Sequence, residues 1–172
     1  MERPFTGIKS LETPSTYAAL TYDPLDISAA INRVRSPKAG AIVTFIGTTR
    51  DNFQGKQITT LEYTSYPPLS LQTLSKILTS LSTPSLHSIS VIHRLGIVPI
   101  GEDSIVISLS TPHRAEAWQI AQECLELVKE KVEIWKREWF ADGGIWRANR
   151  DGAEGVQETE DVPVEFLEQE DR

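Results

Sequence analysis

Cysteine, histidine and basic residues are scarce in this sequence, and each shortage excludes a class of protein. The 172 residues include one cysteine and three histidines, which is too few for a disulfide framework and does not match a zinc motif. The net charge of -7 lacks the basic footprint of general nucleic-acid binding. No apolar run approaches the roughly 20 residues of a membrane span, so we expect a cytosolic protein that binds neither nucleic acid nor membrane.

Glycine-rich phosphate-binding motifs are also absent. The sequence contains no P-loop, no dinucleotide-binding glycine pattern and no nucleophile elbow. An anion would therefore have to bind to side chains. Because the chain as a whole is acidic, any such site must be a local cluster of basic residues.

Composition divides the chain into three parts. Residues 1–16 contain Pro, Gly, Ser and Thr with little periodicity, which predicts a flexible leader. Residues 17–150 have the apolar content and periodicity of a single domain. Residues 151–172 are rich in Glu and Asp, which predicts a disordered tail.

Apolar spacing predicts alternating helices and strands within the domain. Helical spacing occurs over residues 22–37, 70–81 and 110–138, with Ser70 placed to cap the second helix. Strand character occurs over residues 40–50, 57–66, 86–96 and 103–111. The first two strands are separated by a polar turn and should form a hairpin. This order of elements favours an α+β fold, with a mostly antiparallel sheet covered by helices.

The helix predicted over residues 110–138 has basic residues in its first turn. Thr111 and Pro112 match an N-cap followed by proline at the first helical position. His113 and Arg114 would then lie beside unpaired backbone N–H groups, at an end that already favours an anion. Either residue alone is more typical of an ordinary helix end.

Two lysines later in the same predicted helix are seven residues apart. On one helix Lys129 and Lys136 would point in nearly the same direction, two turns apart. Glu133 lies between them, so the spacing alone favours a solvated row of weak ion pairs over an anion site. His93 and Arg94 end an apolar strand, and we interpret them as structural.

Three segments resemble a known family, in matching order. GAIVTFIGTTRDN at 40–52, VIHRLGIVPIGEDSIVISLSTPHRAEAW at 91–118 and VKEKVEIWKRE at 128–138 are similar to the large, catalytic subunit of molybdopterin synthase. That family transfers sulfur to cyclic pyranopterin monophosphate from the thiocarboxylated Gly-Gly terminus of a small ubiquitin-like subunit. The product is molybdopterin. The resemblance implies a hammerhead-like fold, no cofactor or metal, and a homodimer at the centre of a heterotetramer.

The resemblance also implies roles for particular residues. Lys129 and Lys136 match the family's two catalytic lysines. The substrate contacts of the family fall on His113, Arg114, Lys129, Lys136, Arg137, Glu138 and Arg50, and Arg150 matches an arginine that reaches the pocket of the neighbouring protomer. Two alternatives stay open: a non-catalytic scaffold that binds a ubiquitin-like tail, and an acyl or phosphoryl transferase that uses the same cations on another anion.

Overall fold

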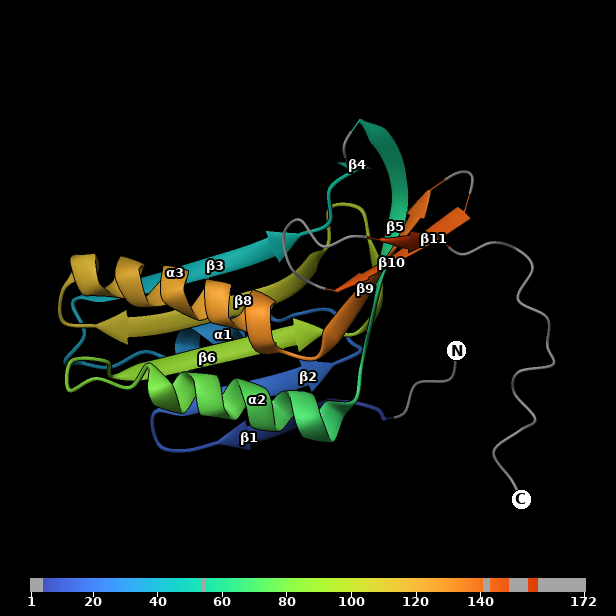
Figure 1. The fold of residues 1–172 in the computed structure, drawn as a ribbon. Coiled ribbons are helices and arrows are strands. Elements are labelled where there is room, and N and C mark those ends of the chain that lie inside the picture. The colour runs from blue at the N-terminus through green and yellow to red at the C-terminus, as the bar shows by residue number, and fades with distance from the viewer. Residues whose placement is uncertain (1–4, 54, 141–142, 149–154, 158–172) are drawn as a thin grey trace, which may run out of the picture.

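Two β-sheets, each assembled from distant parts of the chain, define the fold (Figure 1). The computed structural model describes residues 5–53, 55–140, 143–148 and 155–157. Within these ranges the chain forms three helices and eleven strands, which confirms the predicted α+β class. None of the described helices is long and apolar enough to cross a membrane.

The first sheet has five strands and is covered by helices on both faces. Its order is β1 (Ile8–Glu12), β2 (Thr16–Thr21), β6 (Ser88–Arg94), β8 (Asp103–Thr111) and β3 (Ala41–Thr48). All neighbours are antiparallel except β2 and β6, which run parallel. Helices α2 (Pro67–Ser80) and α3 (Arg114–Lys131) lie side by side on one face, and α1 (Ile27–Arg33) lies on the other (Figure 1).

The second sheet stands across one end of the first (Figure 1). Its order is β11 (Val156–Gln157), β10 (Gly143–Ala148), β9 (Ile134–Phe140), β5 (Lys56–Ser65) and β4 (Asn52–Phe53), and β7 (Gly96–Pro99) also pairs with β5. The main core lies between the first sheet and helices α2 and α3, and it continues under the second sheet through Ile58, Leu61 and Phe140.

The helix predicted over residues 110–138 is shorter at both ends. Thr111 ends β8, and its Oγ1 donates a hydrogen bond to the carbonyl of His113, which is the N-cap. At the other end α3 stops at Lys131 and β9 begins at Ile134. The Lys, Arg and Glu residues in this region favour a helix locally. Residues 134–140 form a strand instead, because their backbone N–H and C=O groups are hydrogen-bonded to β5.

The early end of α3 changes the prediction for the lysines. Lys129 is on the helix and Lys136 is on a strand, so they do not share a helical face. Glu133 does not bridge them as predicted, because its Oε1 accepts a hydrogen bond from Thr73 at 3.0 Å. Trp135, which falls within the range of the predicted helix, is on β9 and 47% exposed.

Other predicted elements differ in their partners or boundaries. The strands at 40–50 and 57–66 exist as β3 and β5, but they belong to different sheets, and β5 forms its hairpin with β4. Ser70 lies inside α2, whose N-cap is Tyr66. Part of the predicted leader forms β1, which pairs with β2.

The start of β3 is held against the turn that leads into α3. A Cβ atom built on Gly40 would lie 2.4 Å from the carbonyl oxygen of Pro112, so only glycine fits at this approach. Ala41 then pairs with Thr111 across β3 and β8. The first residues of β3 and of α3 are therefore neighbours, at the end of the sheet away from the second sheet (Figure 1).

Candidate functional site

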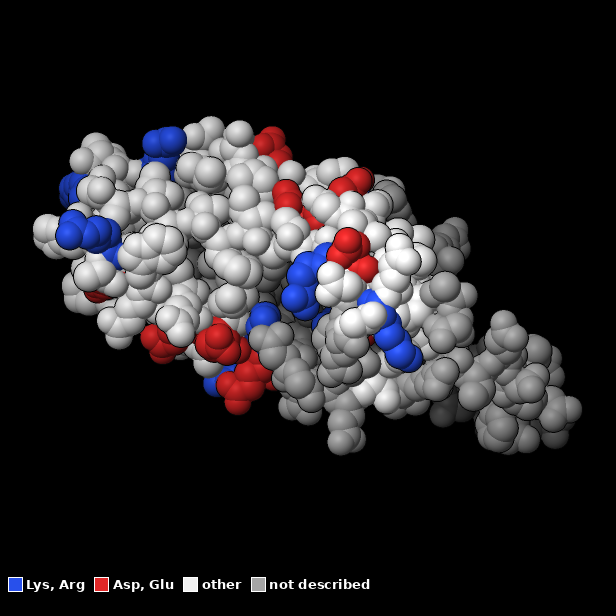
Figure 2. Space-filling model, turned by 90° about the horizontal axis from the view of Figure 1, so that it is seen from above, with Lys and Arg blue, Asp and Glu red and all other residues white. Residues whose placement is uncertain are grey.

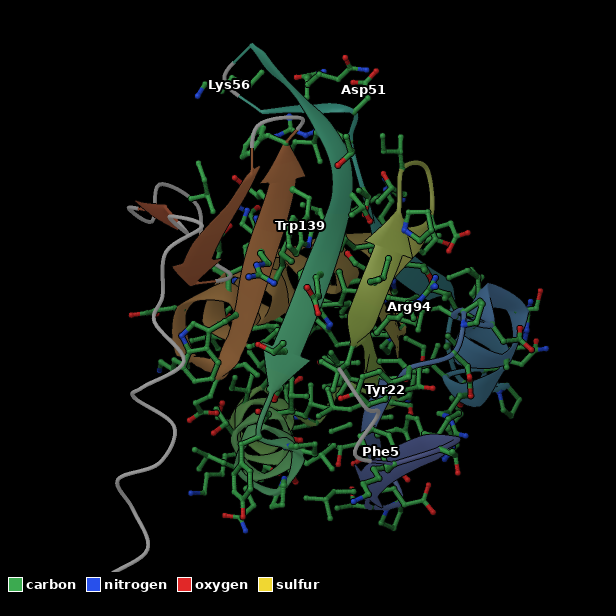
Figure 3. All side chains as sticks on the ribbon, turned by 90° about the vertical axis from the view of Figure 1, so that its right-hand side faces the viewer. Phe5, Tyr22, Asp51, Lys56, Arg94 and Trp139 are labelled. Atoms are coloured by element: carbon green, nitrogen blue, oxygen red, sulfur yellow. The ribbon has the colours of Figure 1, made fainter. Side chains whose placement is uncertain are left out.

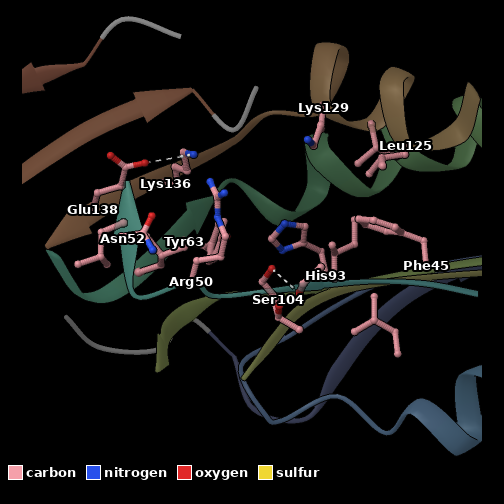
Figure 4. Close-up of a pocket in the computed structure, with 17 residues that line it drawn as sticks. Phe45, Arg50, Asn52, Tyr63, His93, Ser104, Leu125, Lys129, Lys136 and Glu138 are labelled. Atoms are coloured by element: carbon pink, nitrogen blue, oxygen red, sulfur yellow. Dashed lines mark hydrogen bonds and ion pairs between the residues drawn. The ribbon is translucent and has the colours of Figure 1, made fainter. Parts of the chain in front are cut away.

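A pocket lies where the last turn of α3 and the end of β3 meet the second sheet (Figure 4). Its volume is about 350 Å³. The lining residues come from elements far apart in the sequence and include Phe45, Gly47, Arg50, Asn52, Tyr63, His93, Ser104, Leu125, Lys129, Lys136 and Glu138. The pocket thus depends on both sheets and on α3.

Three basic side chains of different origin meet at this pocket. Arg50 follows the end of β3, Lys129 comes from the last turn of α3, and Lys136 comes from β9 (Figure 4). Figure 2 shows basic side chains gathered between the end of α3 and the second sheet, with acidic side chains to either side. In a chain of net charge -7, this arrangement makes a local site for an anion.

One carboxylate belongs to the same pocket. The side chains of Lys136 and Glu138 point to the same face of β9 because they are two residues apart on a strand. The Nζ of Lys136 lies 3.2 Å from Oε1 of Glu138, whose side chain is only 1% exposed. A buried carboxylate is stable only beside such a partner, so the pair fixes the position of the ammonium group at the pocket wall.

Arg137 points away from the pocket, on the outer face of the second sheet. Its guanidinium lies 3.6 Å from a carboxylate oxygen of Glu62 and 4.1 Å from the ring centre of Trp139. Figure 3 shows Trp139 on this outer face. The structure therefore brings Lys136 and Glu138 into the site but leaves out Arg137, because successive residues of a strand alternate between faces.

His93, interpreted from sequence as structural, lines the pocket. Its ring is 1% exposed and packs edge-on against Tyr63, with 4.9 Å between ring centres. The Nδ1 atom lies 2.7 Å from the carbonyl oxygen of Arg94, so Nδ1 carries the proton and donates it. Burial lowers the pKa of His93 to about 4, which keeps the imidazole neutral at pH 7.

Tyr63 and Ser104 join the two sheets at the floor of the pocket. Ser104 of β8 donates a hydrogen bond to the carbonyl of Gly47 at 3.0 Å and lines the same pocket as Tyr63 of β5. Burial raises the pKa of Tyr63, and the nearby carboxylate of Glu138 raises it further. These side chains stay uncharged, so the charge of the pocket comes from Arg50, Lys129, Lys136 and Glu138.

We expect the buried imidazole of His93 to make the protein less stable in acid. Between about pH 4 and 6.5 the unfolded chain protonates this histidine and the folded chain does not, so the free energy of unfolding falls as the pH is lowered through this range. The loss should reach about 3 kcal/mol. Urea unfolding at pH 7, 5 and 4 measures it, and His93→Gln should remove this part of the pH dependence. An unchanged pH dependence in His93→Gln would contradict the assignment.

Two predicted site residues are distant from the pocket in the same protomer. His113 and Arg114 are exposed at the start of α3, whereas Lys129 is in its last turn. Arg114 and Lys129 are 15 positions apart on α3, which corresponds to about 22 Å along the helix axis. Arg150, the other residue predicted for the site, lies outside the described residues.

Metal-binding side chains do not cluster in the described ranges. No group of three or more His, Cys, Asp or Glu residues there could hold a metal ion. Cys124 is buried in the core, and burial raises the pKa of its thiol to about 12. A buried thiol that stays protonated contributes only to packing, so we assign Cys124 no role in the pocket.

The chain is similar to proteins of one family in both sequence and structure. The family described as MoaE protein matches residues 20–131. A relative from Sclerotinia sclerotiorum, the molybdopterin synthase catalytic subunit, is 56% identical over 156 residues, which cover 89% of this chain and 80% of the relative. Among solved structures, molybdopterin synthase from Staphylococcus aureus has a TM-score of 0.72 and 29% identity, over 74% of this chain and 94% of that chain.

A second solved structure is similar in fold. It is the protein-protein complex of subunits 1 and 2 of molybdopterin-converting factor from Helicobacter pylori, with a TM-score of 0.54 and 22% identity. The match covers 62% of this chain and 70% of that chain.

Proposed function

Because this chain belongs to the MoaE family as a molybdopterin synthase catalytic subunit, we propose that its basic pocket is the site of sulfur transfer. The substrate is cyclic pyranopterin monophosphate, and the sulfur donor is the C-terminal thiocarboxylate of a small ubiquitin-like subunit. Both reactants are anions. The observation that carries the proposal is that Arg50, Lys129 and Lys136 meet at one pocket of an acidic chain.

The three cations have a function at each stage of the reaction. They attract the phosphate of the pterin and the thiocarboxylate, and charge-assisted hydrogen bonds from Lys and Arg hold such groups well. When the thiocarboxylate sulfur has bonded to the pterin, loss of the carrier passes through a tetrahedral oxyanion at the acyl carbon. Opening of the cyclic phosphate ester also develops negative charge. Cations already in place stabilise both without reorganisation.

Lys129 is the residue that we assign to the acyl centre. It stands on the last turn of α3, and Leu125, one turn earlier, lines the same pocket. Lys136 is held by Glu138 on the opposite wall, so its position is more constrained. We assign Lys136 and Arg50 to the phosphate and the pterin. The chemistry requires no resident metal or redox cofactor in this proposal, because the partner delivers the sulfur.

The small subunit must place its terminus inside this pocket. The similar structure from Helicobacter pylori is a complex of two subunits, which supports a partner of this kind. A narrow pocket admits an extended chain only where side chains are small, which is why a Gly-Gly terminus suits it. We propose that this terminus enters beside Lys129.

We expect deletion of the two terminal glycines of the small subunit to stop product formation. The intact thiocarboxylated small subunit, mixed with this protein and cyclic pyranopterin monophosphate, should give molybdopterin, detected by mass spectrometry. The truncated subunit should still associate through its globular surface, and a binding measurement checks that it does. Product formation by the truncated subunit at the rate of the intact one would contradict the proposed site.

His113 and Arg114 require a second protomer if they contact the substrate. About 22 Å of helix separates Arg114 from Lys129 in the same chain, which is longer than the pocket. We propose that the catalytic subunit is a homodimer at the centre of a heterotetramer, and that each pocket receives His113 and Arg114 from its neighbour. Arg150 stays a prediction for the same shared site.

We also propose that the reaction takes place in the cytosol. The single cysteine, Cys124, is buried and cannot form a disulfide within the chain. Proteins with this cysteine usage are typical of reducing compartments.

A further inference from the structure

Arg50 lies between β3 and β4, outside both strands. Strand β3 ends at Thr48, and its pairing with β8 is already irregular between Gly47 and Thr48. The β3–β8 ladder therefore does not fix where Arg50 stands. Its side chain is nevertheless directed into the pocket, on the side of Lys136 (Figure 4). Other contacts must hold this part of the backbone.

Backbone hydrogen bonds on both sides of Arg50 supply those contacts. The N–H of Thr49 donates to the carbonyl of Glu102 at 3.0 Å, and the N–H of Gly101 donates to the carbonyl of Thr49 at 2.8 Å. On the other side, the carbonyl of Asp51 accepts a hydrogen bond from β5 at 2.8 Å. Thr49 is thus tied twice to the turn between β7 and β8, so the position of that turn decides where Arg50 stands.

The turn between β7 and β8 is not part of a hairpin. The N–H of Glu102 donates to the carbonyl of Pro99 at 3.1 Å, and Gly101 has the positive φ, 81°, that the third position of a type II turn requires. In the described part of the chain, however, β7 pairs with β5 of the second sheet, and β8 pairs with β3 and β6 of the first. No ladder between the two strands orients the turn.

Arg94, interpreted from sequence as structural, clamps this turn from the end of β6. Its Nη1 lies 2.6 Å from Oε2 of Glu102, and its Nη2 donates to the carbonyl of Ile97 at 3.3 Å. The planar fork of one guanidinium therefore joins β7 to the far end of the turn. The side chain of Arg94 is 10% exposed and that of Glu102 is 47% exposed. Figure 3 shows Arg94 at the end of the molecule that carries the second sheet.

We propose that Arg94 and Glu102 are positioning residues for sulfur transfer. Their ion pair fixes the turn that holds Thr49, and the turn fixes the place of Arg50 in the pocket. The inference rests on the proposed function, which assigns Arg50 to the phosphate and the pterin. Neither residue of the ion pair lines the pocket, so both act through the backbone that they hold. Such positioning matters because a displacement of about 1 Å at a reacting centre can cost about 100-fold in rate.

Glu102→Ala tests the proposal, because it removes the more exposed half of the ion pair. We expect kcat/KM for cyclic pyranopterin monophosphate to fall about three- to tenfold, with the fold intact by circular dichroism. Glu102→Gln keeps an acceptor for the guanidinium and should stay within about twofold of wild type. Arg94→Lys, which keeps the charge but loses the fork, should also lower kcat/KM, and it keeps the test valid if Glu102→Ala folds poorly.

Glu12→Ala is the matched control. It breaks another exposed ion pair, in which Oε2 of Glu12 lies 3.5 Å from Nη1 of Arg33. Glu12 is on β1, at the edge of the first sheet opposite β3. This variant should lose as little stability as Glu102→Ala and should keep the wild-type kcat/KM.

A double-mutant cycle separates positioning from a general structural role. Arg50→Ala alone should lower kcat/KM by about tenfold or more. Adding Glu102→Ala to Arg50→Ala should then change kcat/KM by less than about twofold, because no guanidinium is left to position. An equal fall in both backgrounds would show a merely structural role and would overturn the inference.

Arg50→Ala also separates failure of this inference from failure of the proposed function. If Arg50→Ala is impaired while folded Glu102→Ala and Arg94→Lys keep the wild-type kcat/KM, the basic pocket stands and the inference is wrong. If Arg50→Ala itself keeps the wild-type kcat/KM, the assignment of Arg50 to the substrate is wrong and the inference falls with it.

Discussion

Lys129→Ala is expected to lower the rate of molybdopterin formation by about 100-fold or more, because it removes the cation that we assign to the acyl centre. The fold should persist, since a Lys→Ala change in the last turn of a helix removes no buried contact of the core. Single-turnover formation of product from the thiocarboxylated small subunit measures the effect. Circular dichroism and a binding assay with that subunit check that the variant is intact.

Two further variants make this result specific to the pocket. Lys131→Ala removes an exposed lysine of the same helical turn that does not line the pocket, and it should keep the wild-type rate. Lys129→Arg keeps the charge but cannot take part in proton transfer at neutral pH. Recovery of most activity in Lys129→Arg would assign the residue to charge stabilisation. Activity of Lys129→Ala within a few-fold of wild type would remove Lys129 from the mechanism.

Mixed dimers of Lys129→Ala and Arg114→Ala are expected to regain activity that neither variant has alone. If each pocket takes Lys129 from one protomer and Arg114 from the other, a mixed dimer has one pocket with both residues and one with neither. Random assortment makes about half of the dimers mixed, and one of the two pockets in each mixed dimer contains both wild-type residues. About a quarter of all pockets in the preparation should therefore be active. Co-expression of the two variants with different affinity tags gives the mixed dimer for assay.

The matched control combines Lys129→Ala with Lys136→Ala. Both lysines line the same pocket of one protomer, so no pocket of that mixed dimer is complete and activity should stay at the level of the single variants. Purified Lys129→Ala and Arg114→Ala mixed dimers that remain inactive would show that Arg114 acts in its own protomer or outside the site.

The strands and the basic residues of the pocket could be predicted from sequence to different extents. The apolar, β-branched run at Ala41–Thr48 predicts a strand whatever its neighbours are, and β3 confirms it. The segment at Ile134–Phe140 contains Lys, Arg and Glu, which are good helix formers, and its strand state depends on pairing with β5 about 75 residues earlier in the chain. Such long-range pairing leaves no mark in local composition.

The pocket itself was less accessible to sequence reasoning than its lysines. The family resemblance identifies Lys129 and Lys136, but their spacing predicts that both lie on one helix. In the structure Lys136 is on a strand, and alternation along that strand turns Lys136 and Glu138 toward the pocket. His93 cannot be recognised from sequence as a pocket residue. A histidine at the end of a buried strand has the same sequence pattern whether its side chain faces a cavity or the core. Its place at the pocket depends on where β5 crosses the first sheet.

The connection through α3 has a consequence for folding. This helix joins β8 of the first sheet to β9 of the second, and β9 must pair with β5, which lies about 75 residues earlier in the chain. Closing so long a loop costs more entropy than forming local turns and helices, so contacts of this kind form slowly. We therefore expect helices α2 and α3 and the local strand pairs β1–β2 and β6–β8 to form before β9 docks on β5. Until β9 is in place, Lys136 and Glu138 have no fixed position relative to Lys129, and a nascent or refolding chain cannot hold the reactants.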